Sequence, residues 1–268
     1  MPIRKTQAHS RATEFLQLVG HPLRWRLMEE LAHSDRMVNE LTTRIGEPQN
    51  LVSYHLGKLR DANVVSMRRS SADRRDAYYT ANLTQLGDEL SALGSALHPG
   101  LALQLTPLST RPDGRSGTRS AAHTRVLFLC TGNSARSQMA QALIKIRFQG
   151  KVEVFSAGSE PKAIHPLAIR AMQEEHGIDL SRQSSRHLKV YADQHFDWVI
   201  TLCDKVREVC PEFPGHPHTI HWSLPNPATP DSKGSIGYEA FRATARELEV
   251  RIGFLLAALA NPRPNLKE

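Results

Sequence analysis

Strands that alternate with helices in the second half of the chain limit its fold more than any other feature. Apolar, strand-like segments occupy residues 124–130, 151–158, 196–203 and 218–222, with helical segments at 135–146, 166–177 and 238–260. This order predicts an α/β domain with a four-stranded parallel sheet. Ligands of such sheets bind beyond the carboxyl ends of the strands, where Cys130 and Cys203 both fall. The two cysteines are therefore expected to be able to share one site.

The segment VLFLCTGNSARSQMA carries the sharpest chemical signal. Five residues separate Cys130 from Arg136, Gly132 permits a tight turn, and a helix is expected from near Ser137. Backbone N–H groups of such a loop point at one anion, and the helix N-terminus adds its dipole. Arg136 can grip two oxygens, and the same positive field should turn Cys130 into a reactive thiolate. The residues predicted to bind a tetrahedral oxyanion are Thr131, Gly132, Asn133, Ser134, Ala135 and Arg136. The alternative is a buried strand-end cysteine beside a surface arginine.

From about residue 123 to 262, the chain resembles the low-molecular-weight protein tyrosine phosphatase superfamily, and CTGNSARSQMA is closest to its thioredoxin-coupled arsenate reductase branch. The resemblance implies that Cys130 is the nucleophile and Arg136 the oxyanion clamp. It also implies that Asn133 shapes the loop and that Ser137 activates the thiolate.

The chain has three cysteines, and the second and third, Cys203 and Cys210, lie seven residues apart in ITLCDKVREVC. An intact helix would separate them by about 10 Å, and a disulfide needs Cα atoms within about 7 Å, so bonding them requires unwinding. An odd cysteine count in a cytosolic chain favours thiol or metal chemistry. Zinc is the weaker alternative because its cysteine ligands are usually closer in sequence. Histidines that could join a zinc site are His187, His195, His216, His218 and His221.

The resemblance implies a relay of the three cysteines, with no bound cofactor. Cys130 attacks arsenate, Cys203 then attacks Cys130 and releases arsenite, and Cys210 attacks Cys203. The resulting disulfide is reduced by thioredoxin.

One position departs from the family pattern. The general acid usually lies in an Asp-Pro step, and this chain has Asn226-Pro227, whose amide cannot donate a proton as an acid does. Asp204 and Asp231 are possible substitutes. This departure keeps three alternatives open: a tyrosine phosphatase, an oxyanion-sensing repressor with little turnover, and a degenerate domain used only in dimerisation.

Residues 1–98 are expected to form a mainly-α winged helix-turn-helix domain, joined by a flexible linker (99–122) to the α/β domain (123–268). Helical segments up to residue 63, an Arg-rich hairpin over 64–82 and a helix over 83–97 resemble the ArsR/SmtB family of repressors. The resemblance implies a homodimer, formed through this domain, on operator DNA. The residues expected to contact the major groove are Gln49, Asn50, Ser53, Tyr54 and His55, and those on the wing are Arg68, Arg69, Arg74 and Arg75. A small helical interaction domain with a basic hairpin is the alternative.

Two further observations concern partners. The formal net charge is +7, which suits an anionic partner such as DNA or an oxyanion. The chain shows neither an apolar run of about 20 residues nor a secretory signal, so we expect a cytoplasmic protein without membrane attachment. No metal site is expected in the first domain, which lacks cysteine and in which Asp88 and His98 do not suffice.

Overall fold

The structure is a computed structural model that describes residues 3–98, 101, 124–147, 152–230 and 236–260, with side chains described from residue 11 to 259. The chain forms two compact units, Met1–Thr106 and Pro107–Glu268. The predicted linker over 99–122 lies almost wholly outside the described residues and stays a prediction.

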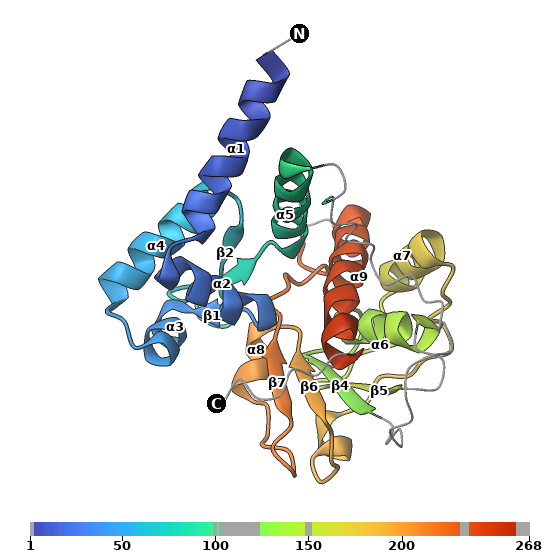
Figure 1. Ribbon diagram of the computed structural model, residues 1–268. Coiled ribbons are helices and arrows are strands. Elements are labelled where there is room, and N and C mark those ends of the chain that lie inside the picture. The colour runs from blue at the N-terminus through green and yellow to red at the C-terminus, as the bar shows by residue number, and fades with distance from the viewer. Residues whose placement is uncertain (1–2, 99–100, 102–123, 148–151, 231–235, 261–268) are drawn as a thin grey trace, which may run out of the picture. The chain divides into compact units, whose positions relative to one another are not determined.

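The first unit has the predicted mainly-α winged helix-turn-helix fold (Figure 1). Its three short strands form an antiparallel sheet in the order β1-β3-β2, and β2 and β3 form the predicted hairpin. Its elements are α1 (Ile3–Val19), α2 (Pro22–His33), β1 (Arg36–Met37), α3 (Val38–Ile45), α4 (Gln49–Asp61), β2 (Val65–Arg69), β3 (Ala77–Ala81) and α5 (Leu83–Leu97).

Local sequence explains where these helices begin and end. The ring of His21 accepts a hydrogen bond from the Leu23 amide, and Pro22 takes the first helical position of α2. Gly46, at φ 75°, ends α3 in the left-handed conformation that glycine adopts without strain. The turn between α3 and α4 is thereby fixed, and fully buried leucines of α2, α3 and α4 form the core.

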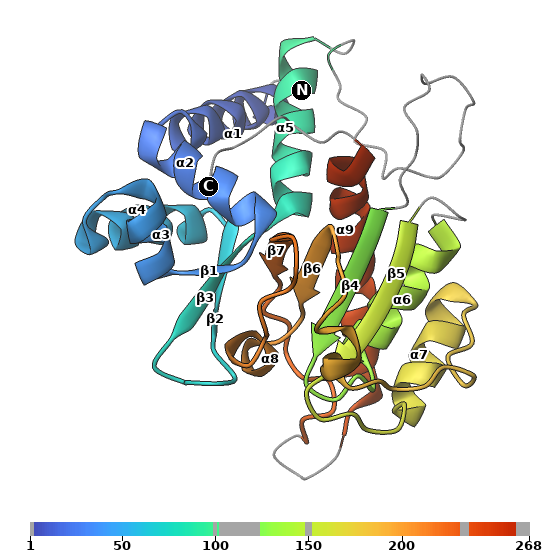
Figure 2. The same cartoon turned by 90° about the horizontal axis from the view of Figure 1, so that it is seen from below.

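The second unit has the predicted α/β fold with a four-stranded parallel sheet in the order β5-β4-β6-β7 (Figure 2). The helices α6, α7 and α9 lie together on one face of the sheet. Its elements are β4 (Thr124–Cys130), α6 (Arg136–Arg147), β5 (Val152–Gly158), α7 (Pro166–His176), the 3-10 helix η2 (Leu188–Tyr191), β6 (Trp198–Thr201), α8 (Asp204–Glu208), β7 (His218–His221) and α9 (Tyr238–Ala260).

The central strand β4 explains why this unit can hold a chemical site rigidly. Residues 126–129 are completely buried, because β4 is flanked by β5 and β6 and covered on both faces. On the side toward α6, Ser156 of β5 accepts and donates hydrogen bonds, whereas Phe155 faces the other way and packs on Tyr191 and Phe196. The loop after β4 therefore starts from a strand that cannot shift without disturbing the core.

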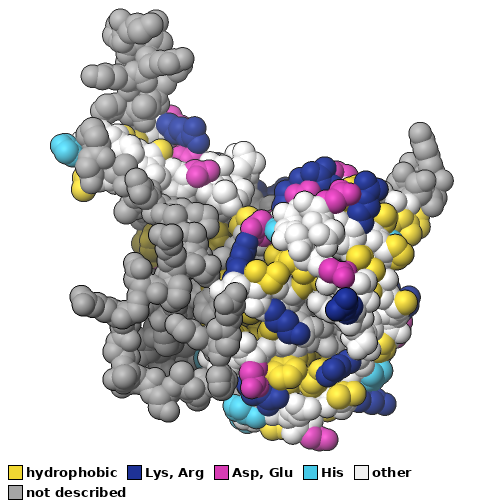
Figure 3. Space-filling view, turned by 90° about the vertical axis from the view of Figure 1, so that its right-hand side faces the viewer, with side chains coloured by type: hydrophobic (Ala, Val, Ile, Leu, Met, Phe, Trp, Pro, Cys, Tyr) yellow, Lys and Arg dark blue, Asp and Glu magenta, His cyan; other side chains and the backbone are white. Residues whose placement is uncertain are grey.

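Charged side chains on the outside of this unit are interspersed in sign, as the face in Figure 3 shows. Ion pairs on α7 and α9 include Arg170–Glu174, Arg242–Glu175 and Arg246–Glu239. Within the described part of the chain, no helix combines the length and the apolar character needed to cross a membrane.

Candidate active site and nucleic-acid interface

The loop between β4 and α6 has the strand–loop–helix form that the sequence predicts. Cys130 is the last residue of β4, and Arg136 is the first residue of α6. The left-handed residue of the loop is Asn133, at φ 45°, and not Gly132, to which the sequence assigned the tight turn. Asparagine is among the few residues that adopt this conformation readily, because its short polar side chain can bond locally.

Four hydrogen bonds hold the side chain of Asn133, and with it the left-handed backbone conformation of this residue. Its amide nitrogen donates to Ser137 Oγ at 2.8 Å and to Ser156 Oγ at 2.9 Å. Its amide oxygen accepts from Gln138 Nε2 at 3.1 Å and from the Arg186 backbone at 2.8 Å. Because Asn133 is completely buried, these bonds satisfy the whole amide and hold the loop in shape.

Gly158, which the sequence analysis did not single out, makes room for the loop. A Cβ atom at this last residue of β5 would lie 2.5 Å from Thr131 O and 2.8 Å from Asn133 N. Both atoms are backbone and cannot move aside without deforming the loop. The pattern SAG at the end of an expected strand was the available signal, since glycine there marks a close backbone approach.

The thiol of Cys130 lies 3.0 Å from Ser137 Oγ, and both residues are buried. Ser137 Oγ accepts a hydrogen bond from Asn133, and its own hydrogen can be donated to the sulfur when Cys130 is a thiolate, which can only accept. A hydrogen bond to the charged form stabilises a thiolate. The geometry therefore suits a nucleophilic sulfur at the mouth of an anion-binding loop.

The guanidinium of Arg136 is oriented by two backbone carbonyls. Its Nη1 donates to Leu224 O at 2.8 Å and to Leu202 O at 3.3 Å. Only 7% of the residue is exposed, so the charge lies in a largely desolvated setting. Held through Nη1, the group can offer its Nε–Nη2 edge as a fork to two oxygens of an anion.

Cys203 lies against the same loop, as the shared strand ends predicted. It follows β6, which adjoins β4, and its sulfur is 3.3 Å from Thr131 Oγ1. A backbone hydrogen bond of 2.7 Å from Leu202 N to Leu129 O continues the pairing of the two strands up to the cysteines. The structure therefore brings Cys130, the oxyanion loop and Cys203 together.

Cys210 lies just beyond α8, and it is a free thiol like the other two. The helix between Cys203 and Cys210 is shorter than the intact helix considered from the sequence, because α8 covers only Asp204–Glu208. Burial raises the pKa of the Cys210 thiol to about 11. Because α8 has only five residues, less helix must unwind for Cys203 and Cys210 to meet than if the whole segment between them were helical.

The general-acid position is occupied by a residue of a turn. Asn226 is exposed, its side-chain oxygen accepts from Ala228 N at 3.4 Å, and its backbone oxygen accepts from Thr229 N at 3.1 Å. The suggested substitute Asp204 is wrong on geometric grounds. It is 1% exposed, and its Oδ1 is engaged by Ser223 Oγ at 2.6 Å and His221 Nε2 at 3.2 Å. The other suggested substitute, Asp231, lies outside the described residues.

Two of the histidines considered for zinc make structural contacts instead. His187 caps η2 by accepting from Lys189 N at 3.1 Å, and His218 packs on Trp198 with 4.6 Å between ring centroids. Among the residues that the structure describes, no three or more His, Cys, Asp or Glu side chains are grouped to hold a metal ion.

In the first unit, α4 presents most of the expected DNA-contact residues to solvent. Gln49, Asn50, Ser53 and Tyr54 are exposed, and Tyr54 reaches 58% exposure. The expectation for His55 is wrong, because this residue is only 5% exposed. It lies three residues after Val52 and one before Leu56, and so it belongs to the buried face of the helix.

His55 instead packs inside the helix-turn-helix. Its ring centroid is 4.3 Å from that of His21, the capping residue of α2. Burial lowers the pKa of His55, and the nearby His21 and Arg24 lower it further. The ring of His55 therefore packs α4 against the start of α2.

The arginines of the hairpin differ in how their charge is used. Arg75 pairs with Asp73 at 2.5 Å, and the hydrogen bonds from Arg75 lower the pKa of Asp73 to about 2. Arg69 Nη1 donates to Arg75 O at 3.0 Å, which braces the turn, and Arg74 is exposed. Arg68 is half-buried and donates to Arg69 O at 2.9 Å.

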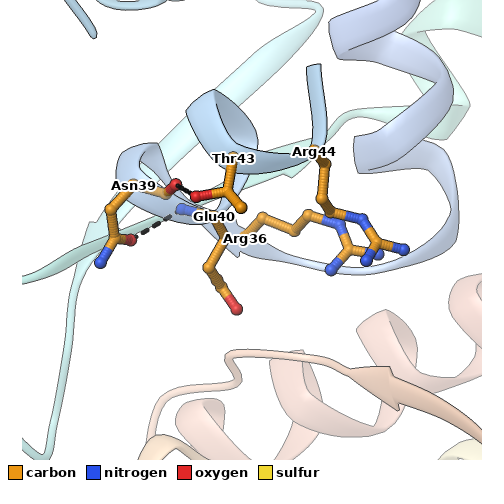
Figure 4. A pocket seen from close by; sticks show the side chains of 5 residues that line it. All are labelled: Arg36, Asn39, Glu40, Thr43 and Arg44. Atoms are coloured by element: carbon orange, nitrogen blue, oxygen red, sulfur yellow. Dashed lines mark hydrogen bonds between the residues drawn. The ribbon is translucent and has the colours of Figure 1, made fainter. Parts of the chain in front are cut away.

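A surface depression on α3 and β1 is occupied by its own ion pairs. Its lining residues are labelled in Figure 4: Arg36, Asn39, Glu40, Thr43 and Arg44. The two guanidinium groups lie near each other, and both pair with Glu30, at 3.0 Å from Arg36 and 2.8 Å from Arg44. These charges therefore serve the packing of α2 against α3.

Comparisons with known proteins agree with this geometry. The family model "Low molecular weight phosphotyrosine protein phosphatase" matches residues 125–265, and the model "Bacterial regulatory protein, arsR family" matches residues 21–67. An arsenate reductase of Halalkalibacterium halodurans is 38% identical over 127 residues, which is 47% of this chain and 91% of the relative. An arsenate reductase of Brevibacillus brevis is 44% identical over 103 residues, 38% of this chain and 76% of the relative.

Among solved structures, an arsenate reductase in its oxidized state is 34% identical, with a TM-score of 0.44, and the match covers 51% of this chain and 98% of that one. The phosphatase family model spans just over half of the 268 residues. The match includes the loop between β4 and α6, the strands β5, β6 and β7, and the helix α9. The chain belongs to the low-molecular-weight phosphotyrosine protein phosphatase family through its second unit, and it carries an arsR-family regulatory segment in its first.

Proposed function

We propose that this chain is a DNA-binding transcriptional regulator fused to a thioredoxin-coupled arsenate reductase that acts in arsenic resistance. The observation that carries the proposal is the sulfur of Cys203, 3.3 Å from Thr131 in the oxyanion loop that Cys130 begins. A phosphatase needs one cysteine in this loop, whereas a reductase needs a second thiol within reach of the first. The relatives named arsenate reductase give further support.

Arsenate binds to the backbone N–H groups of the loop and to Arg136. The Cys130 thiolate attacks arsenic and forms an S–As bond, and one oxygen leaves as water after taking up protons. The Cys203 thiolate then attacks Cys130 Sγ and forms a disulfide. The S–As bond breaks, its electron pair stays on arsenic, and arsenic(V) leaves as arsenic(III) in arsenite.

The relay ends at Cys210, the thiol that lies beyond α8. After α8 unwinds, the Cys210 thiolate attacks Cys203 Sγ, and Cys130 departs as a thiolate ready for another cycle. Reduced thioredoxin, a dithiol, supplies the two electrons that reopen the Cys203–Cys210 disulfide. In the cytoplasm, where protein thiols are kept reduced, this reductant is available.

The first unit binds operator DNA as a homodimer. The exposed polar residues Gln49, Asn50 and Ser53 on α4 suit contacts to base edges, and the hairpin arginines suit phosphates. The fusion joins a DNA-binding domain to a domain that binds the oxyanion. Arsenate, or the redox state of the cysteines, is therefore the signal that releases the chain from its operator.

The test is arsenate-dependent NADPH consumption in the presence of thioredoxin and its reductase. The native chain should turn over, and both Cys203→Ser and Cys210→Ser should abolish steady-state turnover. A native chain that binds phosphate or arsenate but consumes no NADPH would contradict the reductase.

Asn226 favours a second candidate, an oxyanion-sensing repressor with little turnover. An amide at this position cannot protonate a leaving group, and expulsion of a phenolate would suffer most. This candidate predicts arsenate-dependent release of DNA by a chain that also carries Cys203→Ser. The reductase proposal predicts that product formation precedes any redox-dependent release.

A further inference from the structure

Four buried polar side chains beside Cys203 form a connected group that the reaction steps above do not use. The residues are Thr201, Asp204, His221 and Ser223, and each is at most 5% exposed. Thr201 Oγ1 lies 2.8 Å from His221 Nδ1, and His221 Nε2 lies 3.2 Å from Asp204 Oδ1. Ser223 Oγ donates to the same carboxylate oxygen at 2.6 Å.

Placing a carboxylate in the interior is unfavourable unless it is paired and hydrogen-bonded. Asp204 is bonded by His221 of β7 and by Ser223 of the segment after β7, and Thr201 of β6 holds the other nitrogen of the His221 ring. Thr201 and His221 are register partners at the ends of these two strands. The group therefore ties the first residue of α8 to the rigid edge of the sheet.

A second bridge runs beside the first. Arg136 Nη1 bonds to both Leu202 O and Leu224 O, so it joins the same two chain segments that Asp204 and Ser223 join. Cys203 lies between Leu202 and Asp204 in sequence. Its backbone is therefore fixed on one side by the oxyanion clamp and on the other by the buried carboxylate.

The opposite end of α8 ends at exposed residues, and Cys210 beyond it is only partly buried against the core. Glu208 is exposed, Val209 is 57% exposed, and the amide of Cys210 makes a long hydrogen bond of 3.4 Å to Arg207 O. A helix of five residues anchored at one end opens from the other, because each of its few hydrogen bonds is lost in turn.

We infer that Asp204 and His221 are positioning residues that hold Cys203 beside the oxyanion loop while α8 unwinds from its Cys210 end. This inference rests on the proposed reductase function, in which Cys203 is first attacker and then target. Cys203 stays in place through both steps, and Cys210 is the thiol that travels.

The test uses the full chain with Asp204→Asn and, as a matched control, Glu208→Gln at the exposed end of the same helix. A single turnover with arsenate and no added reductant is quenched at intervals, and arsenite release is measured together with the affinity for inorganic phosphate. Asp204→Asn should slow arsenite release about 10- to 100-fold, the effect of a small misplacement of a reacting group, and leave phosphate affinity unchanged. Glu208→Gln should change neither quantity.

Conservative replacement separates positioning from mere stability. His221→Gln keeps a side-chain amide that can donate to Asp204, and it should retain more of the arsenite-release rate than His221→Leu. Equal loss of phosphate affinity and arsenite release in Asp204→Asn, or native rates of release, would overturn the inference. If Asp204→Asn does not fold, Ser223→Ala, which removes the 2.6 Å bond, should slow release in the same direction.

Hydrogen exchange gives a readout that does not depend on arsenate chemistry. In the reduced chain, Asp204→Asn should speed amide exchange across residues 204–208 and leave 131–137 unchanged, whereas Glu208→Gln should leave both protected to the native degree. Unchanged exchange at 204–208 would overturn the anchoring role. Absence of arsenite release from the native chain would instead contradict the reductase proposal, and the exchange comparison would still decide the role of Asp204.

Discussion

The sulfur of Cys203 lies 3.3 Å from the hydroxyl of Thr131, so the thiol that we propose as the second attacker lies on the loop that follows Cys130. The contact spans 72 residues of sequence and exists because β4 and β6 are neighbours in the sheet. The sheet thus places Cys203 beside the residue that directly follows Cys130.

Removing the Thr131 hydroxyl should weaken the attack of Cys203. Thr131→Val keeps the shape and deletes the hydrogen-bonding group, and we expect arsenite release in a single turnover to slow about tenfold, as for loss of a hydrogen bond to a charged group. Thr131→Ser restores the hydroxyl and should restore the rate. Equal rates in the valine and serine variants would show that the contact has no part in the reaction.

Ser137→Ala should lower the reactivity of Cys130. The variant deletes the hydroxyl that lies 3.0 Å from the sulfur, and a thiolate that loses a donor is harder to form. Alkylation of Cys130 by iodoacetamide near neutral pH, followed by peptide mass spectrometry, should slow about tenfold. Ser95→Ala on α5, whose hydroxyl donates to Ser91 O, is the matched control and should react at the native rate.

Gly158→Ala should damage the oxyanion loop. The added methyl would meet Thr131 O at 2.5 Å, so the backbone of the loop must shift, at about 1–3 kcal/mol of unfolding free energy. Phosphate binding, measured by calorimetry, should be lost or greatly weakened. Gly253→Ala, in α9, where a Cβ meets nothing within 4 Å, should be neutral or stabilising by up to about 1 kcal/mol. Native phosphate affinity in Gly158→Ala would contradict the close approach.

The step that uses Cys210 should be strongly pH-dependent. Because burial raises the pKa of this thiol to about 11, its thiolate fraction rises about tenfold per pH unit through the range 7 to 10. The rate of Cys203–Cys210 disulfide formation after one turnover should rise in the same proportion. A rate that levels off near pH 9 would contradict a buried, protonated Cys210 as the starting state of this step.

The two aromatic residues at the centre of α4 should behave in opposite ways. His55→Ala removes a buried ring that packs on His21, and it should destabilise the chain by about 2–4 kcal/mol in urea denaturation. Tyr54→Ala, at a position that is 58% exposed, should leave stability nearly unchanged and weaken binding to DNA fragments selected from a random pool. Full DNA affinity in Tyr54→Ala would remove this face of α4 from the interface.

Local sequence determined much of this protein. The strand–loop–helix around Cys130, the parallel sheet, the hairpin wing and the helix boundaries all follow from periodicity and turn residues, which act between near neighbours. The polar face of α4 was predicted for the same reason, except at His55, where a polar residue type occupies an apolar helical position.

Tertiary structure decided the details on which the chemistry depends. Asn133 takes the left-handed turn because Ser156 and Arg186, 23 and 53 residues away, complete its hydrogen bonds. Arg136 is aimed by Leu224, 88 residues later, and Asp204 is buried because His221 and Ser223 converge on it. Such contacts join segments that meet only after the sheet has formed, so no pattern of neighbouring residues encodes them.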